Sequence, residues 1–211
     1  DKVTFRPWLR SLLGKTLDGR TLRSTHEQRP NNWGTHAGAA RVAIAAYLGD
    51  PIETAQAARV FRGYLGDRAF YAGFKYGDLA WQCDPARPVG INPAGCVRYG
   101  RSLDGVLPDD QRRSGGFRWP APQENYAWEG LQGATLQAEL LTRAGYPAWT
   151  WSNNALLRAT KWLYNINSFP ATGDDEWQPW LIDERYGTRF ATARPARWGK
   201  NFGGTDWLYG S

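Results

Sequence analysis

Hydrophobic residues recur at helical spacing over much of the chain. Residues 35–48 are apolar almost all round and are interrupted by a single arginine, which is typical of a helix buried on most sides. Asp50, Pro51 and Glu53 then stand at the N-cap, first and third positions of a second helix, over residues 51–65. Two helices joined by so short a turn are expected to form an antiparallel hairpin.

Three further helices are predicted towards the C-terminus. The longest helical pattern spans residues 124–144, and the next runs from residue 152 to residue 163. Residues 172–200 have loop character, with a short strand expected at 180–182, and residues 205–209 begin a last helical turn.

This order of elements predicts an all-α fold. Antiparallel helix hairpins with long loops at one end indicate a single domain over residues 1–211 that is an (α/α) toroid or part of one. A complete toroid needs more helices than the pattern shows. The missing helices are therefore expected from a longer precursor or from another chain.

Residues 71–122 form the longest stretch without a sustained period, and their many Gly, Pro and Asp residues predict a structured loop. Cys83 and Cys96 enclose a Pro- and Gly-rich part of this loop. A disulfide explains the pair better than zinc does, because no other cysteine is present and both histidines are distant in sequence. The alternative is a pair of free buried thiols. The sequence has no apolar run long enough to span a membrane and no signal segment. Together with the predicted disulfide, this indicates a mature protein that is secreted, extracellular or periplasmic.

Composition adds an anionic partner to this picture. The 26 Lys and Arg residues outnumber the 20 Asp and Glu residues, and the net charge of +6 favours an anion. The 12 Trp residues suit stacking on sugar rings as well as core packing. The sequence contains no metal-ligand spacing, phosphate-cradling glycine motif, nucleophile elbow or nucleic-acid module. Neither a cofactor or metal nor a nucleic acid partner is therefore expected.

The first group of candidate site residues is the segment NNWGTH at positions 31–36. Thr35 is expected to cap the following helix, with His36 as the first helical residue. The positive end of the helix dipole favours a bound carboxylate and disfavours the imidazolium form, so a neutral His36 is a usable base. The alternative is that Asn32 and Thr35 only cap the helix and that His36 is an ordinary buried histidine.

The second group lies where the 124–144 helix begins. Tyr126 and Glu129 are three residues apart and therefore share a helical face. Gly130 and Gly133 are interpreted as clearing space beside them for a bulky ligand, and a tyrosine hydroxyl that faces a groove can transfer a proton. The alternative is that Tyr126 packs in the core while the glycines allow close contact between helices.

Charged and polar runs make up a third group, although such runs are usually solvated faces. These runs are Arg112-Arg113, Asp174-Asp175-Glu176 and Gly199-Lys200-Asn201. Arg112 and Arg113 precede a Ser-Gly-Gly segment, where a flexible loop can lay guanidinium groups on polymer carboxylates.

Three blocks of the sequence resemble the alginate-lyase-like superfamily of polysaccharide lyases. They are NNWGTH, the stretch SLDGVLPDDQRRSGGFRWPAPQENYAWEGLQGATLQAELLTRAGY, and the closing GKNFGGTDWLYG. Members of that superfamily are (α/α) toroids that cleave alginate, glucuronan or related uronates without hydrolysis. Their sites use an Asn and a His from such an Asn-rich helix start, with a Tyr and an Arg from later segments.

The resemblance implies four catalytic residues: Asn32 (or Asn31), His36, Tyr126 and Arg118. In several relatives the Asn and the His are adjacent, whereas three residues separate them here. Asn32 and His36 still share a face if the helix starts early. The expected substrate-binding residues are Asn31, Trp33, Arg112, Arg113, Trp119, Glu129, Lys200 and Asn201.

The implied reaction is β-elimination on an acidic uronate polymer. It needs donors that neutralise the C5 carboxylate, a base for the C5 proton and an acid for the leaving O4. Asn32 and Arg118 suit the first task, and His36 and Tyr126 suit proton transfer. Two alternatives stay open: a glycoside hydrolase that uses Glu129 with Asp174 or Asp175, and a non-catalytic glycan-binding module.

Overall fold

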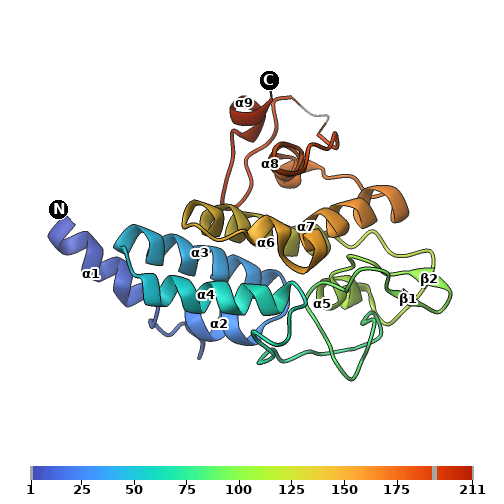
Figure 1. The fold of residues 1–211 in the computed structure, drawn as a ribbon, viewed down its shortest axis with the longest axis horizontal. Helices are drawn as coiled ribbons and strands as arrows, with labels where there is room; N and C mark the ends of the chain where they lie inside the picture. Colours follow the sequence, from blue (N-terminus) through green and yellow to red (C-terminus); the bar gives the residue numbers. More distant parts are fainter. Residues whose placement is uncertain (1, 192–193, 211) are drawn as a thin grey trace.

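The computed structural model describes residues 2–191 and 194–210 (Figure 1). Helices dominate this part of the chain, which confirms the all-α prediction. The toroid stays a prediction. The elements are α1 (Lys2–Leu12), α2 (Leu22–Gln28), α3 (Asn32–Leu48), α4 (Pro51–Tyr64), β1 (Val97–Arg98), β2 (Arg101–Ser102), α5 (Pro108–Gln111), η1 (Arg112–Ser114), α6 (Asn125–Arg143), η2 (Ala148–Thr150), α7 (Trp151–Lys161), η3 (Trp162–Ile166), η4 (Gly173–Asp175), α8 (Trp177–Tyr186) and α9 (Thr205–Tyr209).

Helix α3 lies at the centre of the molecule and packs against α2, α4 and α6 (Figure 1). It ends at Gly49, whose φ of +65° is the left-handed conformation that glycine adopts readily. Asp50 then accepts a hydrogen bond from the backbone N–H of Glu53 at 3.0 Å and caps α4. The predicted α3–α4 hairpin is thus confirmed, and its turn carries the chemistry that the sequence indicated.

Residues 151–186 include the two helices α7 and α8. The prediction of a strand at 180–182 is wrong, because these residues lie within α8 (Trp177–Tyr186). Pro179 is in the first turn of that helix, where a missing N–H costs nothing. The helix expected from residue 152 is confirmed as α7, but Ser152 and Asn153 have positive φ values of 50° and 56°. Arg158 donates hydrogen bonds of 3.0 Å to the carbonyls of both residues, which stabilises this left-handed turn.

The long loop of residues 71–122 is confirmed, with α5, η1 and the two-residue strands β1 and β2 as its elements. Cys83 and Cys96 are disulfide-bonded, as predicted. The loop contributes Trp81 to the main core, which also contains Trp128, Trp149, Trp162 and Trp177, each at most 6% exposed. At least five of the twelve tryptophans therefore serve packing rather than surface contact.

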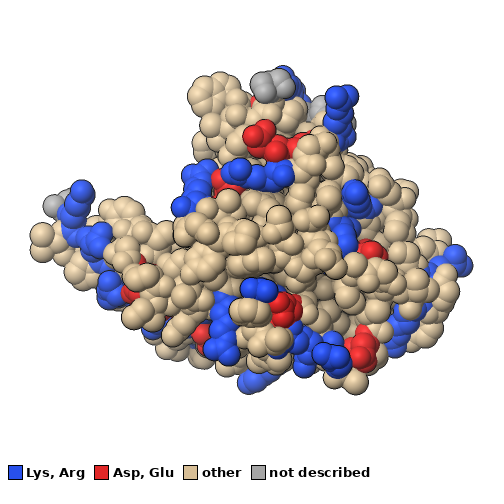
Figure 2. Space-filling model, viewed as in Figure 1, with Lys and Arg blue, Asp and Glu red and all other residues tan. Residues whose placement is uncertain are grey.

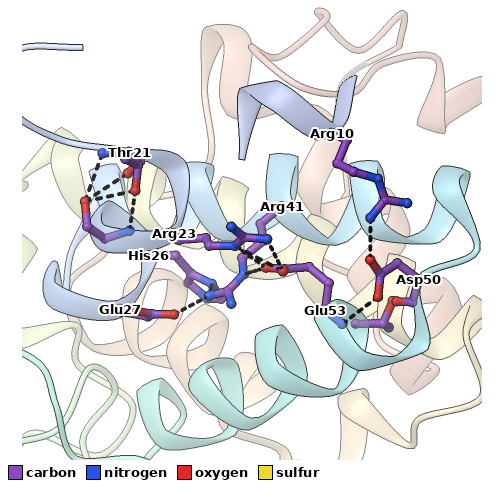
Figure 3. A network of polar contacts seen from close by, with 10 residues as sticks. Arg10, Thr21, Arg23, His26, Glu27, Arg41, Asp50 and Glu53 are labelled. Atoms are coloured by element: carbon purple, nitrogen blue, oxygen red, sulfur yellow. Dashed lines mark hydrogen bonds and ion pairs between the residues drawn. The ribbon is translucent and has the colours of Figure 1, made fainter. Parts of the chain in front are cut away.

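A buried ionic network joins α2, α3 and α4 (Figure 3). Arg41 of α3 is fully buried and bonds Glu53 at 2.6 Å and Glu27 at 2.9 Å. Arg23 of α2 binds the same Glu53 carboxylate at 2.6 Å. Burial raises the pKa of Glu53, but the bonds from Arg23 and Arg41 outweigh this and hold it below its ordinary value. His26 lies beside Arg41, and burial with that nearby charge lowers its pKa to about 3.

The surface carries basic side chains in several separate places, interspersed with acidic ones, rather than in one continuous patch on the face of Figure 2. The excess of positive charge is therefore spread over the fold on this face. Among the helices that the structure describes, none combines the length and the apolar character that spanning a membrane requires.

Candidate functional site

The N-terminus of α3 is capped by Asn31, not by Thr35 as expected from the sequence. The Asn31 side chain accepts a hydrogen bond from the backbone N–H of Trp33 at 3.2 Å, and the helix begins at Asn32. The reason is that an Asn with extended backbone starts the helix one turn earlier. His36 therefore lies in the second turn, and Asn32 and His36, four residues apart, share one face of α3.

Two aspartates from α5 hold this helix start in place. Asn31 Nδ2 donates to Asp109 Oδ2 at 2.8 Å, and the backbone N–H of Asn32 donates to Asp110 Oδ1 at 3.0 Å. Asp110 is completely buried, and this burial raises its pKa well above the ordinary value. Both ends of the Asn31 amide are thus taken up inside the protein. Asn31 is only 3% exposed, which favours a structural role over substrate contact.

Asn32, Arg113 and Tyr126 come together from three separate segments. Arg113 Nη2 donates to Asn32 Oδ1 at 3.3 Å, and the Arg113 guanidinium lies 4.5 Å from the centre of the Tyr126 ring. Tyr126 is 41% exposed, so its phenol faces outward rather than packing in the core. Arg118 is exposed, and no polar contact joins it to this group within the described residues. The structure thus places Arg113 where the sequence analysis expected Arg118.

His36 has a polar neighbour at each ring nitrogen. Its Nδ1 lies 2.6 Å from Asn201 Nδ2, and its Nε2 lies 3.9 Å from Glu129 Oε2. An amide that donates to Nδ1 assigns the ring hydrogen to Nε2, facing Glu129. Burial lowers the pKa of His36, against the opposing effects of Asn201 and Glu129. The expected neutral imidazole is thus supported, although desolvation rather than the helix dipole is its main cause.

Lys200 completes this side of the site. Its Nζ pairs with Glu129 Oε1 and lies 3.8 Å from Asp174 Oδ2. Its backbone N–H donates to Gln132 Oε1 at 3.3 Å. Gln132 in turn donates to Asp175 Oδ1 at 2.7 Å, and burial raises the pKa of Asp175 to about 7. The segment before α9 is therefore fastened to α6 through both the backbone and the side chain of Lys200.

Gly130 and Gly133 do not clear space for a sugar. A Cβ at Gly130 would meet Asp110, and a Cβ at Gly133 would overlap the backbone of Thr35 and His36. The glycines instead allow α6 to approach α5 and α3 closely. The part of the alternative that concerned the glycines is therefore confirmed, whereas Tyr126 does not pack in the core, and α3 and α6 touch directly next to His36.

The remaining candidate side chains differ in their exposure and in whether another side chain of the protein already binds them. Trp33 is 59% exposed next to Asn32 and presents a ring to solvent. Arg112 is bound to Asp109 at 2.6 Å, and the Trp119 ring is covered by the Arg101 guanidinium at 5.2 Å. Across residues 2–191 and 194–210, no three His, Cys, Asp or Glu side chains are grouped so as to hold a metal ion.

These features define an all-α protein with a candidate acid–base site in which amides and cations surround two groups able to transfer protons. Residues 1–72 match the alginate lyase family model, which supports an alginate-lyase-like family and, more generally, a polysaccharide lyase. The matched segment comprises α1 to α4 and includes Asn32 and His36. No curated protein and no solved structure matches the chain.

Proposed function

We propose that the protein is a polysaccharide lyase that cleaves an alginate- or glucuronan-like uronate polymer by β-elimination, outside the cytoplasm. The observation that carries the proposal is the contact of Arg113 with both Asn32 and Tyr126, one helical turn from His36. The match of residues 1–72 to the alginate lyase family model supports it. The disulfide supports an oxidising compartment.

The chemistry follows from these groups. The Asn32 amide and the Arg113 guanidinium bind the C5 carboxylate and stabilise the charge that moves onto it when C5 loses its proton. The neutral His36 imidazole is suited to accept that proton at Nδ1 once the Asn201 amide, which occupies this nitrogen in the free protein, has turned away, and the Tyr126 phenol is suited to donate one to O4. The C5–H and C4–O4 bonds break, the C4=C5 double bond forms, and O4 leaves as a hydroxyl.

One assay separates this reaction from its rivals. The protein is incubated with alginate, glucuronan, hyaluronan and pectate while near-ultraviolet absorbance and reducing ends are followed together. Elimination gives both signals, because each cut leaves a conjugated double bond. New reducing ends without absorbance would identify a hydrolase, and binding without shortening of the polymer would identify a glycan-binding module.

Two variants test the roles of His36 and Tyr126. His36→Ala and Tyr126→Phe are each expected to lower kcat and kcat/KM by about 10²-fold or more, equivalent to about 2.7 kcal/mol of barrier, because proton transfer is lost in the transition state. Tyr47→Phe, which removes an exposed phenol near the opposite end of α3, is the matched control and should keep full activity. Near-full activity of Tyr126→Phe would show that the phenol takes no part in the reaction.

A further inference from the structure

Two carboxylate-binding groups in the site belong to the segment before α9 rather than to the Asn32–Arg113 pair. Lys200 offers an ammonium and Asn201 an amide, on consecutive residues. In the free protein, Lys200 is paired with Glu129 of α6, and Asn201 with His36 of α3. Both donors are therefore engaged by residues that belong to the site itself.

Glu129 has an unusual position for a surface carboxylate. Its side chain is 12% exposed, one oxygen bonds Lys200 and the other faces His36 at 3.9 Å. It lies one helical turn from Tyr126, on the face of α6 that carries the proposed site. Glu129 thus places a carboxylate beside Lys200 and His36, where the carboxylate of a bound sugar would compete with it.

We infer that Lys200 and Asn201 form a second carboxylate-binding cradle, whose donors are held in the free protein by Glu129 and His36 respectively, and that a uronate carboxylate displaces these two partners. The inference rests on the proposed function, because a uronate polymer supplies a further carboxylate on a neighbouring sugar. Lys200 is 50% exposed, so its ammonium is reachable from solvent. Glu129 lies on helix α6, whereas Lys200 and Asn201 lie outside the helices, so the exchange needs only their side chains to turn while the Lys200 backbone stays bonded to Gln132.

The exchange costs the protein one ion pair and returns another. The pair is partly exposed, and exposed pairs contribute about 0.2–1 kcal/mol. Glu129→Gln keeps the shape of the side chain but removes the competing charge. It is therefore expected to tighten binding of a uronate trisaccharide by about two- to fivefold, from the upper part of that range.

The experiment measures the Kd of a uronate trisaccharide by calorimetry, in the Tyr126→Phe background to prevent cleavage. Glu129→Gln should bind more tightly than its parent, and Lys200→Met should bind more weakly. In the Lys200→Met background, Glu129→Gln should bring no gain, because the charge that it frees is absent. Glu184→Gln removes an equal charge from an exposed position on α8 and is the matched control, with an unchanged Kd expected.

Each other result overturns the inference. Equal or weaker binding by Glu129→Gln would mean that Glu129 contacts the sugar directly or plays no part. A gain that persists in the Lys200→Met background would show a general charge effect rather than a cradle. If the unmodified protein cleaves uronate polymers while Glu129→Gln brings no gain, the inference alone fails. If it neither cleaves nor binds them, the proposed function fails as well.

Discussion

Replacing Glu53 by Gln tests the buried network between α2, α3 and α4 (Figure 3). The substitution preserves shape but removes the charge that faces Arg41 at 2.6 Å. Arg41 has no exposed surface and would keep only Glu27, whose side chain is 37% exposed. A buried ion that loses its partner typically costs about 3–5 kcal/mol. Because Glu27 remains at 2.9 Å, we expect about 3 kcal/mol, the lower end of that range.

Urea denaturation followed by far-ultraviolet circular dichroism at neutral pH measures this loss. For a chain of this size, about 3 kcal/mol corresponds to a fall in Tm of about 6–12 °C. Glu27→Gln is the matched control on the same arginine, and its partly exposed pair should cost at most about 1 kcal/mol. The double variant Arg41→Met/Glu53→Met should lose less than Glu53→Gln, because it leaves no unpaired buried charge.

The reasoning would be refuted by equal, small losses in Glu53→Gln and Glu27→Gln. Such a result would mean that solvent reaches Arg41 and that burial does not determine the energy of the network. A double variant that is less stable than Glu53→Gln would instead show that packing around these side chains, and not unpaired charge, dominates the cost.

Two further predictions concern Arg113 and His26. Arg113→Ala should lower kcat/KM by about 10²-fold or more in the same absorbance assay, because it removes a donor that stabilises transition-state charge. Arg118→Ala changes an exposed arginine without contact to the group and should stay near wild type. The reverse order would restore Arg118 as the site arginine. Burial, with Arg41 nearby, holds the pKa of His26 at about 3, below about 6.5 in the unfolded chain, so the unfolded state binds more protons between these values. The contribution of the neutral His26 to the free energy of unfolding should therefore be fully present above about pH 6.5 and fall on acidification by up to about 1.4 kcal/mol per pH unit. Urea unfolding at pH 7 and pH 5 should show a smaller loss of stability in His26→Gln than in wild type.

The helices that the sequence predicted are those with local signals. Asp50 and Pro51 start α4, and α6 ends before Gly145, because capping depends on neighbours in sequence. Helix α8 was missed because Pro179 and the surrounding aromatics have no clear helical period. Its apolar residues pack against a core that only the folded chain provides. The first two helices were not predicted either; α2 packs against α3, and its Arg23 pairs with the distant Glu53.

In the site, too, the sequence revealed features that depend on single residues but not those that depend on tertiary contacts. His36 and Tyr126 could be named from residue type and position, but choosing between Arg113 and Arg118 required the tertiary contact with Asn32. The pairing of Lys200 with Glu129 joins residues that are far apart in sequence, and no local pattern encodes it. The two glycines of α6 were misread because an absent side chain has the same appearance in the sequence whether a ligand or another helix occupies the space.

The order in which the site residues occur along the chain has a consequence for synthesis. Lys200 and Asn201 leave the ribosome more than a hundred and sixty residues after Asn32 and His36. The central helices can pack before the segment preceding α9 exists, since their contacts with one another do not depend on it. A nascent chain would thus hold the proton-transfer groups in place while still lacking the cradle. Binding that depends on the proposed cradle is acquired only after residues 200–201 have been translated.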